Sequence, residues 1–326
     1  MLGAVVRRPP DLRSAATSPA TFEESNTMFV TCLRFRFAAV SALALAVVSA
    51  APVISSSAKS ETVTPDPMPS AVTNAGNEVS LVSHRAVYEL TLLKSTGTKS
   101  PTAAHGRIAF DFTGSPCDGY VQNFRQLTEL QPAEGPTRVS DMHSATFEDA
   151  DGRNFEFKMQ TSVDSGAAEQ IDGKARRNAG GLLSVSLVKP KHQKFELDQK
   201  VVFPTEHLRR ILAAAESGQN LLEVSVFDGS ETGEKVYETT TYIGHAVAGP
   251  AVEKAAHIPE LDNMRRWPVS ISYFEAGQKD DAPSYILSFD LYENGISRAL
   301  RLDYGDFVLA GEMSSLELLP TPACPK

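Results

Sequence analysis

The feature that most constrains the fold is a two-residue alternation of apolar and polar side chains that begins near residue 84. The apolar side chains of the first such stretch are Ala86, Tyr88, Leu90 and Leu92. The same alternation recurs at 106–112, 119–130 and 154–159. Because successive side chains of a β-strand point to opposite faces, this period predicts strands that bury one face.

Turn signals separate these stretches. Asp151-Gly152 and Asn294-Gly295 are typical of tight β-hairpins, and Asp172-Gly173 and Gly180-Gly181 are interpreted as two further turns. Further strands are expected at 142–147, 168–171, 174–177, 182–188, 222–227, 235–243, 267–275, 284–293, 297–304 and 307–319. About a dozen strands predict an all-β, mainly antiparallel fold, either a barrel or a large curled sheet, in a single domain over residues 80–326.

One segment departs from the alternation and has helical spacing. Its apolar side chains Leu208, Ile211, Leu212 and Ala215 lie on one stripe, which predicts a short amphipathic helix near 205–217. Thr205 is expected to cap the start of this helix, and Gly218 is expected to end it.

The N-terminal residues have the layout of an export signal. Arg34 and Arg36 precede an apolar run at 37–48, and small residues follow it, which predicts a cleavable signal peptide within residues 1–50. The alternative is a membrane anchor, but the run of about 12 residues is shorter than the roughly 20 that a spanning helix needs.

The start and the end of this signal are predicted as well. Met28 is expected to be the true start, and cleavage is expected after Ala50, with Ala58 as the second choice. The following residues, 51–79, are rich in Ser, Pro and Thr and are interpreted as a disordered linker. The sequence therefore predicts an exported protein without a transmembrane anchor after cleavage.

Charge and motif content exclude several classes of function. The formal net charge is −9, which disfavours binding to nucleic acids. The chain has no nucleophile elbow, no phosphate-binding loop and no dinucleotide fingerprint. Zinc-type spacing is absent among the histidines, which are His84, His105, His143, His192, His207, His245 and His257. We therefore predict no catalytic residue, no metal site and no cofactor.

Clusters of charged residues admit two interpretations each. The carboxylates of 148–151 and 279–281 are interpreted as solvated loop charges, with a paired acid and base as the alternative. Three basic pairs could bind an anionic group, although such pairs more often form local ion pairs: Arg176-Arg177, Arg209-Arg210 and Arg265-Arg266.

The chain has an odd number of cysteines, so they cannot all pair with one another. Of the three, Cys32 lies in the predicted signal peptide, which leaves Cys117 and Cys324. Neither belongs to a Cys-x-x-Cys arrangement, so a redox-active pair or a metal clip is unsupported. Two unrelated thiols and one structural disulfide both remain open at this point.

Several segments together resemble a known family. They are 81–90 (LVSHRAVYEL), 114–120 (GSPCDGY), 203–207 (FPTEH), 302–307 (LDYGDF) and the terminal Cys324. In this order they are similar to the EipB family of periplasmic cell-envelope integrity proteins of alphaproteobacteria, from about residue 80 to the end. The resemblance implies a β-spiral resembling a broken barrel, a disulfide between Cys117 and Cys324, a periplasmic location and no known enzymatic activity.

The expected function is therefore non-enzymatic support of the cell envelope, through binding of an envelope protein partner. The alternative is a periplasmic carrier that holds a lipid or a lipoprotein acyl chain inside the curled sheet, and a hydrolase is the weakest hypothesis. The aromatic residues expected to fill the sheet interior could equally line such a cavity. They are Phe110, Phe112, Phe155, Phe157, Phe203, Trp267, Phe274, Phe289 and Phe307.

Overall fold

The computed structural model describes residues 81–97, 100–178, 180–197, 200–277 and 282–322, together with Cys324. The predicted signal peptide (1–50) and linker (51–79) lie outside these residues.

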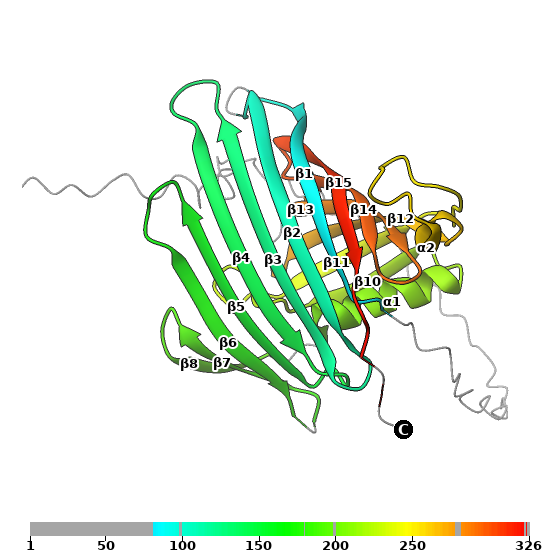
Figure 1. The fold of residues 1–326 in the computed structure, drawn as a ribbon. Coiled ribbons are helices and arrows are strands. Elements are labelled where there is room, and N and C mark those ends of the chain that lie inside the picture. The colour runs from blue at the N-terminus through cyan, green and yellow to red at the C-terminus, as the bar shows by residue number, and fades with distance from the viewer. Residues whose placement is uncertain are drawn as a thin grey trace, which may run out of the picture. The chain divides into compact units, whose positions relative to one another are not determined.

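Figure 1 shows the fold. Its strands are β1 (His84–Ser95), β2 (Ala103–Ser115), β3 (Gly119–Gln131), β4 (Arg138–Glu148), β5 (Asn154–Val163), β6 (Glu169–Arg177), β7 (Leu183–Lys189), β8 (Gln193–Leu197), β9 (Val201–Val202), β10 (Leu221–Val226), β11 (Tyr237–Ile243), β12 (Arg266–Glu275), β13 (Tyr285–Tyr292), β14 (Ser297–Asp303) and β15 (Phe307–Leu318). Its helices are α1 (Pro204–Glu216) and α2 (Pro259–Asp262).

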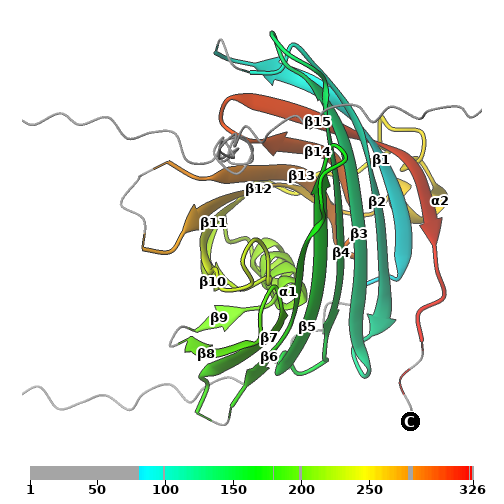
Figure 2. The same ribbon diagram turned by 90° about the vertical axis from the view of Figure 1, so that its left-hand side faces the viewer.

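All strands of the described residues belong to one sheet, in the order β8-β7-β6-β5-β4-β3-β2-β1-β15-β14-β13-β12-β11-β10-β9. The first and last strands are antiparallel neighbours near the middle of the sheet, and each half runs outward from them as a meander. Pairing is antiparallel except between β9 and β10, which are parallel. Figure 2 shows the sheet curling around α1. The predicted fold class, a large curled and mainly antiparallel sheet, is confirmed.

The alternation in sequence becomes the two faces of this sheet. Ala86, Tyr88 and Leu90 are buried on the face that we call the inner face, which is the face that packs against α1. The opposite, outer face carries cross-strand ion pairs such as Arg107–Glu89 and Lys174–Glu156. These pairs are exposed, so they contribute little to stability and mainly keep the outer face polar.

One predicted turn is wrong. Asp172-Gly173 lies within β6, at a register shift against β7, and does not join two strands. Gly173 is buried, and a Cβ atom there would lie 2.6 Å from the ring of Phe157 and 2.8 Å from Leu187. The glycine therefore serves close packing on the inner face, which is the second common reason for a glycine inside a strand.

Helix α1 lies close to the predicted bounds, but its predicted N-cap is wrong. Phe203 is the N-cap residue and makes no side-chain capping bond, while Pro204 and Thr205 are already helical. Beyond the last turn, Gly218 has φ +75° and its N–H donates to the carbonyl of Ala215. Gly218 therefore ends the helix as expected, through a left-handed conformation that glycine adopts without strain.

Three hydrophobic clusters hold the curl together. The first lies around β1, β14 and β15 and includes Tyr88, Leu302 and Met313. The second joins α1 to both halves of the sheet, since Ile211 and Leu212 share a cluster with Tyr120 of β3 and Trp267 of β12. The third lies where the two edges of the sheet approach each other, and its members are Phe155, Phe157, Ala175, Leu183, Val185, Leu187, Val201, Phe203, Phe227 and Val236. The curl is thus held by side-chain packing, because the edge strands β8 and β9 are not neighbours in the hydrogen-bonded strand order.

The irregular segment 244–265, which includes α2, is anchored by a buried charge. Glu253 pairs with Arg298 at 2.5 Å, and the two side chains are 7% and 9% exposed. The other carboxylate oxygen of Glu253 accepts backbone N–H bonds from Ala299 (3.2 Å) and Met313 (2.8 Å). These two amides lie just beyond the last ladder pair of β14 and β15, so Glu253 occupies the place where those strands separate.

Cys117 and Cys324 are adjacent in the structure. Their Cα atoms are 5.7 Å apart and the structure joins their sulfur atoms, across a separation of 207 residues. Cys117 lies in the β2–β3 turn, where the Ser115 hydroxyl accepts its N–H. The C-terminal segment reaches this turn by pairing beside β1, since the N–H of Leu319 donates to the carbonyl of Ser83.

Candidate functional site

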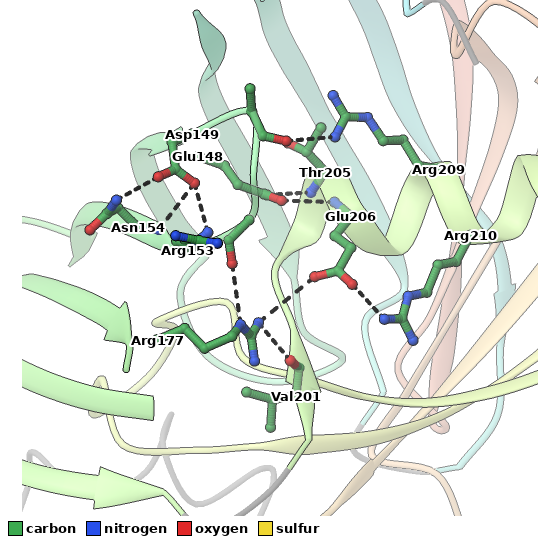
Figure 3. Close-up of polar contacts among 12 residues, drawn as sticks. Glu148, Asp149, Arg153, Asn154, Arg177, Val201, Thr205, Glu206, Arg209 and Arg210 are labelled. Atoms are coloured by element: carbon green, nitrogen blue, oxygen red, sulfur yellow. Dashed lines mark hydrogen bonds and ion pairs between the residues drawn. The ribbon is translucent and has the colours of Figure 1, made fainter. Parts of the chain in front are cut away.

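The most unusual polar contact joins the end of β4 to the start of α1 (Figure 3). The Glu148 carboxylate accepts hydrogen bonds from the backbone N–H groups of Thr205 (2.7 Å) and Glu206 (2.9 Å). These amides belong to the first turn of the helix, where N–H groups have no partner within the helix. Glu148 therefore caps α1 in place of the side chain of Thr205.

Glu148 is only 2% exposed, which corrects its interpretation as a solvated loop charge, whereas Asp151 is exposed in the β4–β5 turn as expected. Burial raises the pKa of its carboxyl to about 7, although the two amides of α1 partly oppose the shift. Its neighbour Asp149 is also structural, because it accepts N–H bonds from Arg153 and Asn154 and so shapes the β4–β5 turn.

Several arginines surround this cap, but their contacts are internal. Arg177 donates to the carbonyl of Val201 at 2.9 Å, and Arg210 pairs with Glu206 at 2.5 Å. Arg209 lies over the ring of Tyr120, 5.0 Å from its centroid. The Glu148 region therefore holds α1 against the sheet, and both oxygens of its one desolvated carboxylate are already occupied by backbone amides.

The other members of the basic pairs have internal partners too. Arg176 donates to Asn154, Arg265 pairs with Glu293, and Arg266 donates to the carbonyl of Gly249. These contacts favour the ion-pair interpretation over an anchor for an anionic group.

A row of aromatic rings crosses the inner face at the far ends of β11 to β15. The successive members are Tyr237, Tyr273, Tyr285, Tyr304 and Phe307, and neighbouring ring centroids are 6.0, 5.8, 5.2 and 4.9 Å apart. We call this set the tyrosine row. Burial raises the pKa of the Tyr273, Tyr285 and Tyr304 hydroxyls, so they stay neutral at physiological pH.

Other side chains cover the tyrosine row only in part, although Tyr237 is buried. Tyr273, Tyr285, Tyr304 and Phe307 are all partly accessible, whereas Trp267 and Leu291, beside α1 on the same face, are buried. Helix α1 thus covers one part of the inner face, and the part with the tyrosine row keeps accessible apolar surface.

The opposite wall of the inner face is uncharged between residues 122 and 146. Its inward side chains on β3 and β4 include Gln122, Phe124, Gln126, Thr128, Met142, Ser144 and Thr146, and all of these except Thr128 are partly accessible. Gln126 reaches the hydroxyl of Tyr304 at 3.5 Å, which connects the two walls. Neutral hydrogen-bonding groups beside aromatic rings make a surface suited to an apolar or amphipathic ligand.

One carboxylate lies near the start of the tyrosine row. Asp228 follows β10 and is partly buried; its carboxylate accepts the N–H of Ser230 at 2.9 Å. Burial raises the pKa of Asp228, and its charge in turn raises the pKa of the Tyr273 hydroxyl, behind the larger effect of burial. Asp228 therefore lies within electrostatic range of the tyrosine row.

The outer face carries a shallow hollow of about 310 Å³ over β2 to β5. Its polar lining includes Asp111, Asn123, Arg125, His143 and Lys158. Asp111 pairs with Arg85 and Arg125 pairs with Asp141, so this lining is largely neutralised by its own ion pairs.

The structure separates most of the residues weighed from sequence. Two histidines are buried, His84 beside Phe110 and Phe112 and His207 on α1, and burial lowers the pKa of both. Within the described ranges, no group of three His, Cys, Asp or Glu side chains has the geometry to hold a metal ion. Phe274 lies on the outer face, opposite in orientation to Tyr273, which corrects its assignment to the interior.

The helices that the structure describes include none with the length and apolar character needed to span a membrane. Sequence reasoning weighed Glu148 only as a loop charge or one of an acid and base pair, and it missed both its capping role and the tyrosine row. The sequence around helix 204–216 gave no sign of the Glu148 cap, because the capping carboxylate is 57 residues from Thr205.

Comparisons with known proteins agree on one relationship. A protein-family model described as EipB-like matches residues 75–320. The chain is 38% identical over 249 residues to the cell envelope integrity protein EipB of Brucella abortus (strain 2308), covering 76% of this chain and 88% of that protein. A crystal structure of a beta-barrel-like protein of the domain of unknown function DUF1849, also from Brucella abortus, has a TM-score of 0.69 and 37% identity and covers 74% of this chain and 100% of that chain. The resemblance expected from the sequence is confirmed, and the chain belongs to the EipB-like family.

Proposed function

We propose that this protein supports the integrity of the bacterial cell envelope by non-covalent binding in the periplasm, without catalysis. The name of the 38% identical relative supports the envelope role. The non-catalytic part rests on Glu148, since its desolvated carboxylate is engaged by the first turn of α1 and not presented to a substrate. An exported location is also where the Cys117–Cys324 disulfide would form and persist.

The observation that carries the binding function is the accessible tyrosine row on the inner face. Soluble domains normally bury aromatic rings of this kind, and exposed apolar surface on a monomer commonly marks a binding site. The facing wall of β3 and β4 is neutral, so the surface is suited to an apolar chain such as the acyl chain of a lipid or lipoprotein. We propose that the protein holds such a chain on its inner face.

Replacement of the chromosomal copy by variants tests this function. Tyr285→Leu removes a ring from the tyrosine row, whereas Tyr242→Leu removes an outer-face tyrosine that is 59% exposed. We expect Tyr285→Leu to increase sensitivity to detergents that attack the envelope and Tyr242→Leu to behave as wild type. Equal growth of both strains in detergent, with normal protein levels, would reject the inner face as the binding surface.

A second candidate is a protein partner bound on the outer face of β3 and β4. Val121, Leu127 and Val139 are 37%, 41% and 37% exposed there. Apolar side chains of this exposure on an otherwise polar face favour protein contact.

Photo-crosslinking from position 127 in living cells tests this candidate, with position 242 on β11 as the outer-face control. A partner crosslinked from 127 and lost in Val121→Lys would support it. The same products from both positions would show non-specific contact and reject a specific partner on β3 and β4.

A further inference from the structure

Beside the tyrosine row lies a carboxylate without a cation. Among the described residues, Asp228 forms no ion pair, and its hydrogen-bond partner is Ser230. The nearby cation Lys235 is already engaged, because it pairs with Glu231 and, at 3.0 Å, with Glu275. A partly buried carboxylate in apolar surroundings is costly unless a positive charge accompanies it.

The rings next to this carboxylate pack against one another at steep angles. Tyr237 and Tyr273 meet edge to face, with an interplanar angle of 85°, and Tyr273 and Tyr285 are tilted by 39°. The hydroxyl of Tyr237 donates to Glu231 at 2.8 Å, which fixes that ring beside the 227–236 loop. Faces of tyrosine rings attract cations, and several such faces with a carboxylate are the means by which proteins recognise quaternary ammonium groups.

The position of the loop supports a built site over a chance arrangement. Gly229, next to Asp228, has φ +71°, and a Cβ atom there would lie 2.4 Å from the ring of Phe157. The loop is therefore pressed against the inner face of β5 and has little freedom to move Asp228 elsewhere. Tyr237 and Tyr273 are likewise held by antiparallel pairing of β11 and β12.

We infer that the tyrosine end of the inner face binds the ammonium group of an amphipathic ligand, with Asp228 as its counter-ion and Tyr237, Tyr273 and Tyr285 as its aromatic walls. This inference rests on the proposed binding of an apolar chain along the inner face and adds the chemistry of the ligand's head. An anionic head would meet Asp228 and Glu231, and a neutral head would leave Asp228 unpaired, so both are disfavoured.

Three probes with the same twelve-carbon chain and different heads test the inference: dodecyltrimethylammonium, dodecyl maltoside and dodecyl sulfate. Each is titrated calorimetrically into the full chain after signal removal, below the concentration at which it forms micelles. We expect the ammonium probe to bind at least about tenfold more tightly than the maltoside, and the sulfate to bind most weakly. Asp228→Asn should abolish the advantage of the ammonium probe over the maltoside, whereas Asp228→Glu should retain it.

Two control variants separate this site from general attraction to an acidic protein. Asp151→Asn removes an exposed aspartate in the β4–β5 turn and should leave the ammonium advantage intact. Tyr273→Phe keeps the ring face and should retain the advantage, while Tyr273→Leu should reduce it several-fold. Folding of each variant is checked by its thermal unfolding midpoint and near-ultraviolet circular dichroism.

The outcomes distinguish recognition of the ammonium head group from binding of the alkyl chain. Equal affinities for the three probes would overturn the ammonium site and leave chain binding standing. An ammonium advantage that survives Asp228→Asn would also overturn it, because the attraction would then arise from the overall negative charge. Failure of all three probes to bind would reject the chain-binding function itself, and with it the inference.

Discussion

Glu148 Oε2 accepts a 2.7 Å hydrogen bond from the backbone N–H of Thr205, and this contact joins the β4 end of the sheet to the helix that the sheet surrounds. The contact lies between residues 57 positions apart and is buried. It explains how α1 begins without a capping side chain of its own. A carboxylate near the helix N-terminus also complements the positive end of the helix dipole.

Glu148 should make stability depend on pH in a defined direction. Its pKa in the folded state is about 7, above the usual 4.5, so the folded protein holds this proton more tightly than the unfolded chain. The stabilisation of the folded state by this proton is therefore complete below about pH 4.5 and is lost as pH rises through 7. Glu148→Gln carries no such proton, so the difference in unfolding free energy between wild type and variant should fall by about 3 kcal/mol from pH 4 to pH 8. Urea titrations at several pH values measure it, and a difference independent of pH would contradict the assignment.

The cysteine pair should contribute strongly to stability. It closes a loop of 207 residues, for which the chain-entropy model gives about 5 kcal/mol. We expect the double variant Cys117→Ser/Cys324→Ser to lose several kcal/mol of unfolding free energy, and reduction of the wild type to have a similar effect. Thiol labelling of protein isolated from its host cells without reductant provides the check. Two accessible thiols in oxidised material would refute the pairing.

The buried pair of Glu253 and Arg298 should be sensitive to loss of one partner. Arg298→Met would leave the Glu253 charge without its cation at a site that is 7% exposed, which costs about 3–5 kcal/mol. Arg301→Met on the same strand removes an exposed arginine and should change stability by less than about 0.5 kcal/mol. Chemical denaturation of both variants measures the contrast, and similar losses would show that the pair is not what anchors 244–265.

Gly229 should tolerate no side chain. Gly229→Ala combines a strained φ of +71° with a Cβ position 2.4 Å from the Phe157 ring. Gly277→Ala shares the strained φ, +81°, but meets no atom within 4 Å. We expect a cost of about 1 kcal/mol at Gly277, from backbone strain alone, and at least about 2 kcal/mol at Gly229. Thermal unfolding compares the two, and equal costs would mean that the 227–236 loop is free to move away from β5.

The sequence predicted the strands well where one face is buried and the other is polar. The alternation at Tyr88 and Leu90 or at Phe155 and Phe157 reflects a physical requirement of such strands, so it is visible without a structure. Strand β8 was missed because Gln193–Leu197 lies at a sheet edge, where Lys and Glu side chains interrupt the apolar pattern.

The misread positions share a different cause. Asp172-Gly173 was predicted to be a turn because the packing partner of Gly173, Phe157, is on another strand and cannot be recognised from the residues next to the glycine. The same holds for the cap of α1, whose acceptor Glu148 lies on β4. The tyrosine row is assembled from four strands and the β14–β15 turn, so no local motif could have revealed the whole of it.

The most direct test of the binding function is native mass spectrometry of the protein purified under mild conditions from its own host cells. We predict an added mass that corresponds to a bound apolar ligand, released on collisional activation and strongly reduced in Tyr285→Leu but not in Tyr242→Leu. Recovery of only ligand-free protein, or an adduct equally abundant in both variants, would contradict a binding site on the inner face.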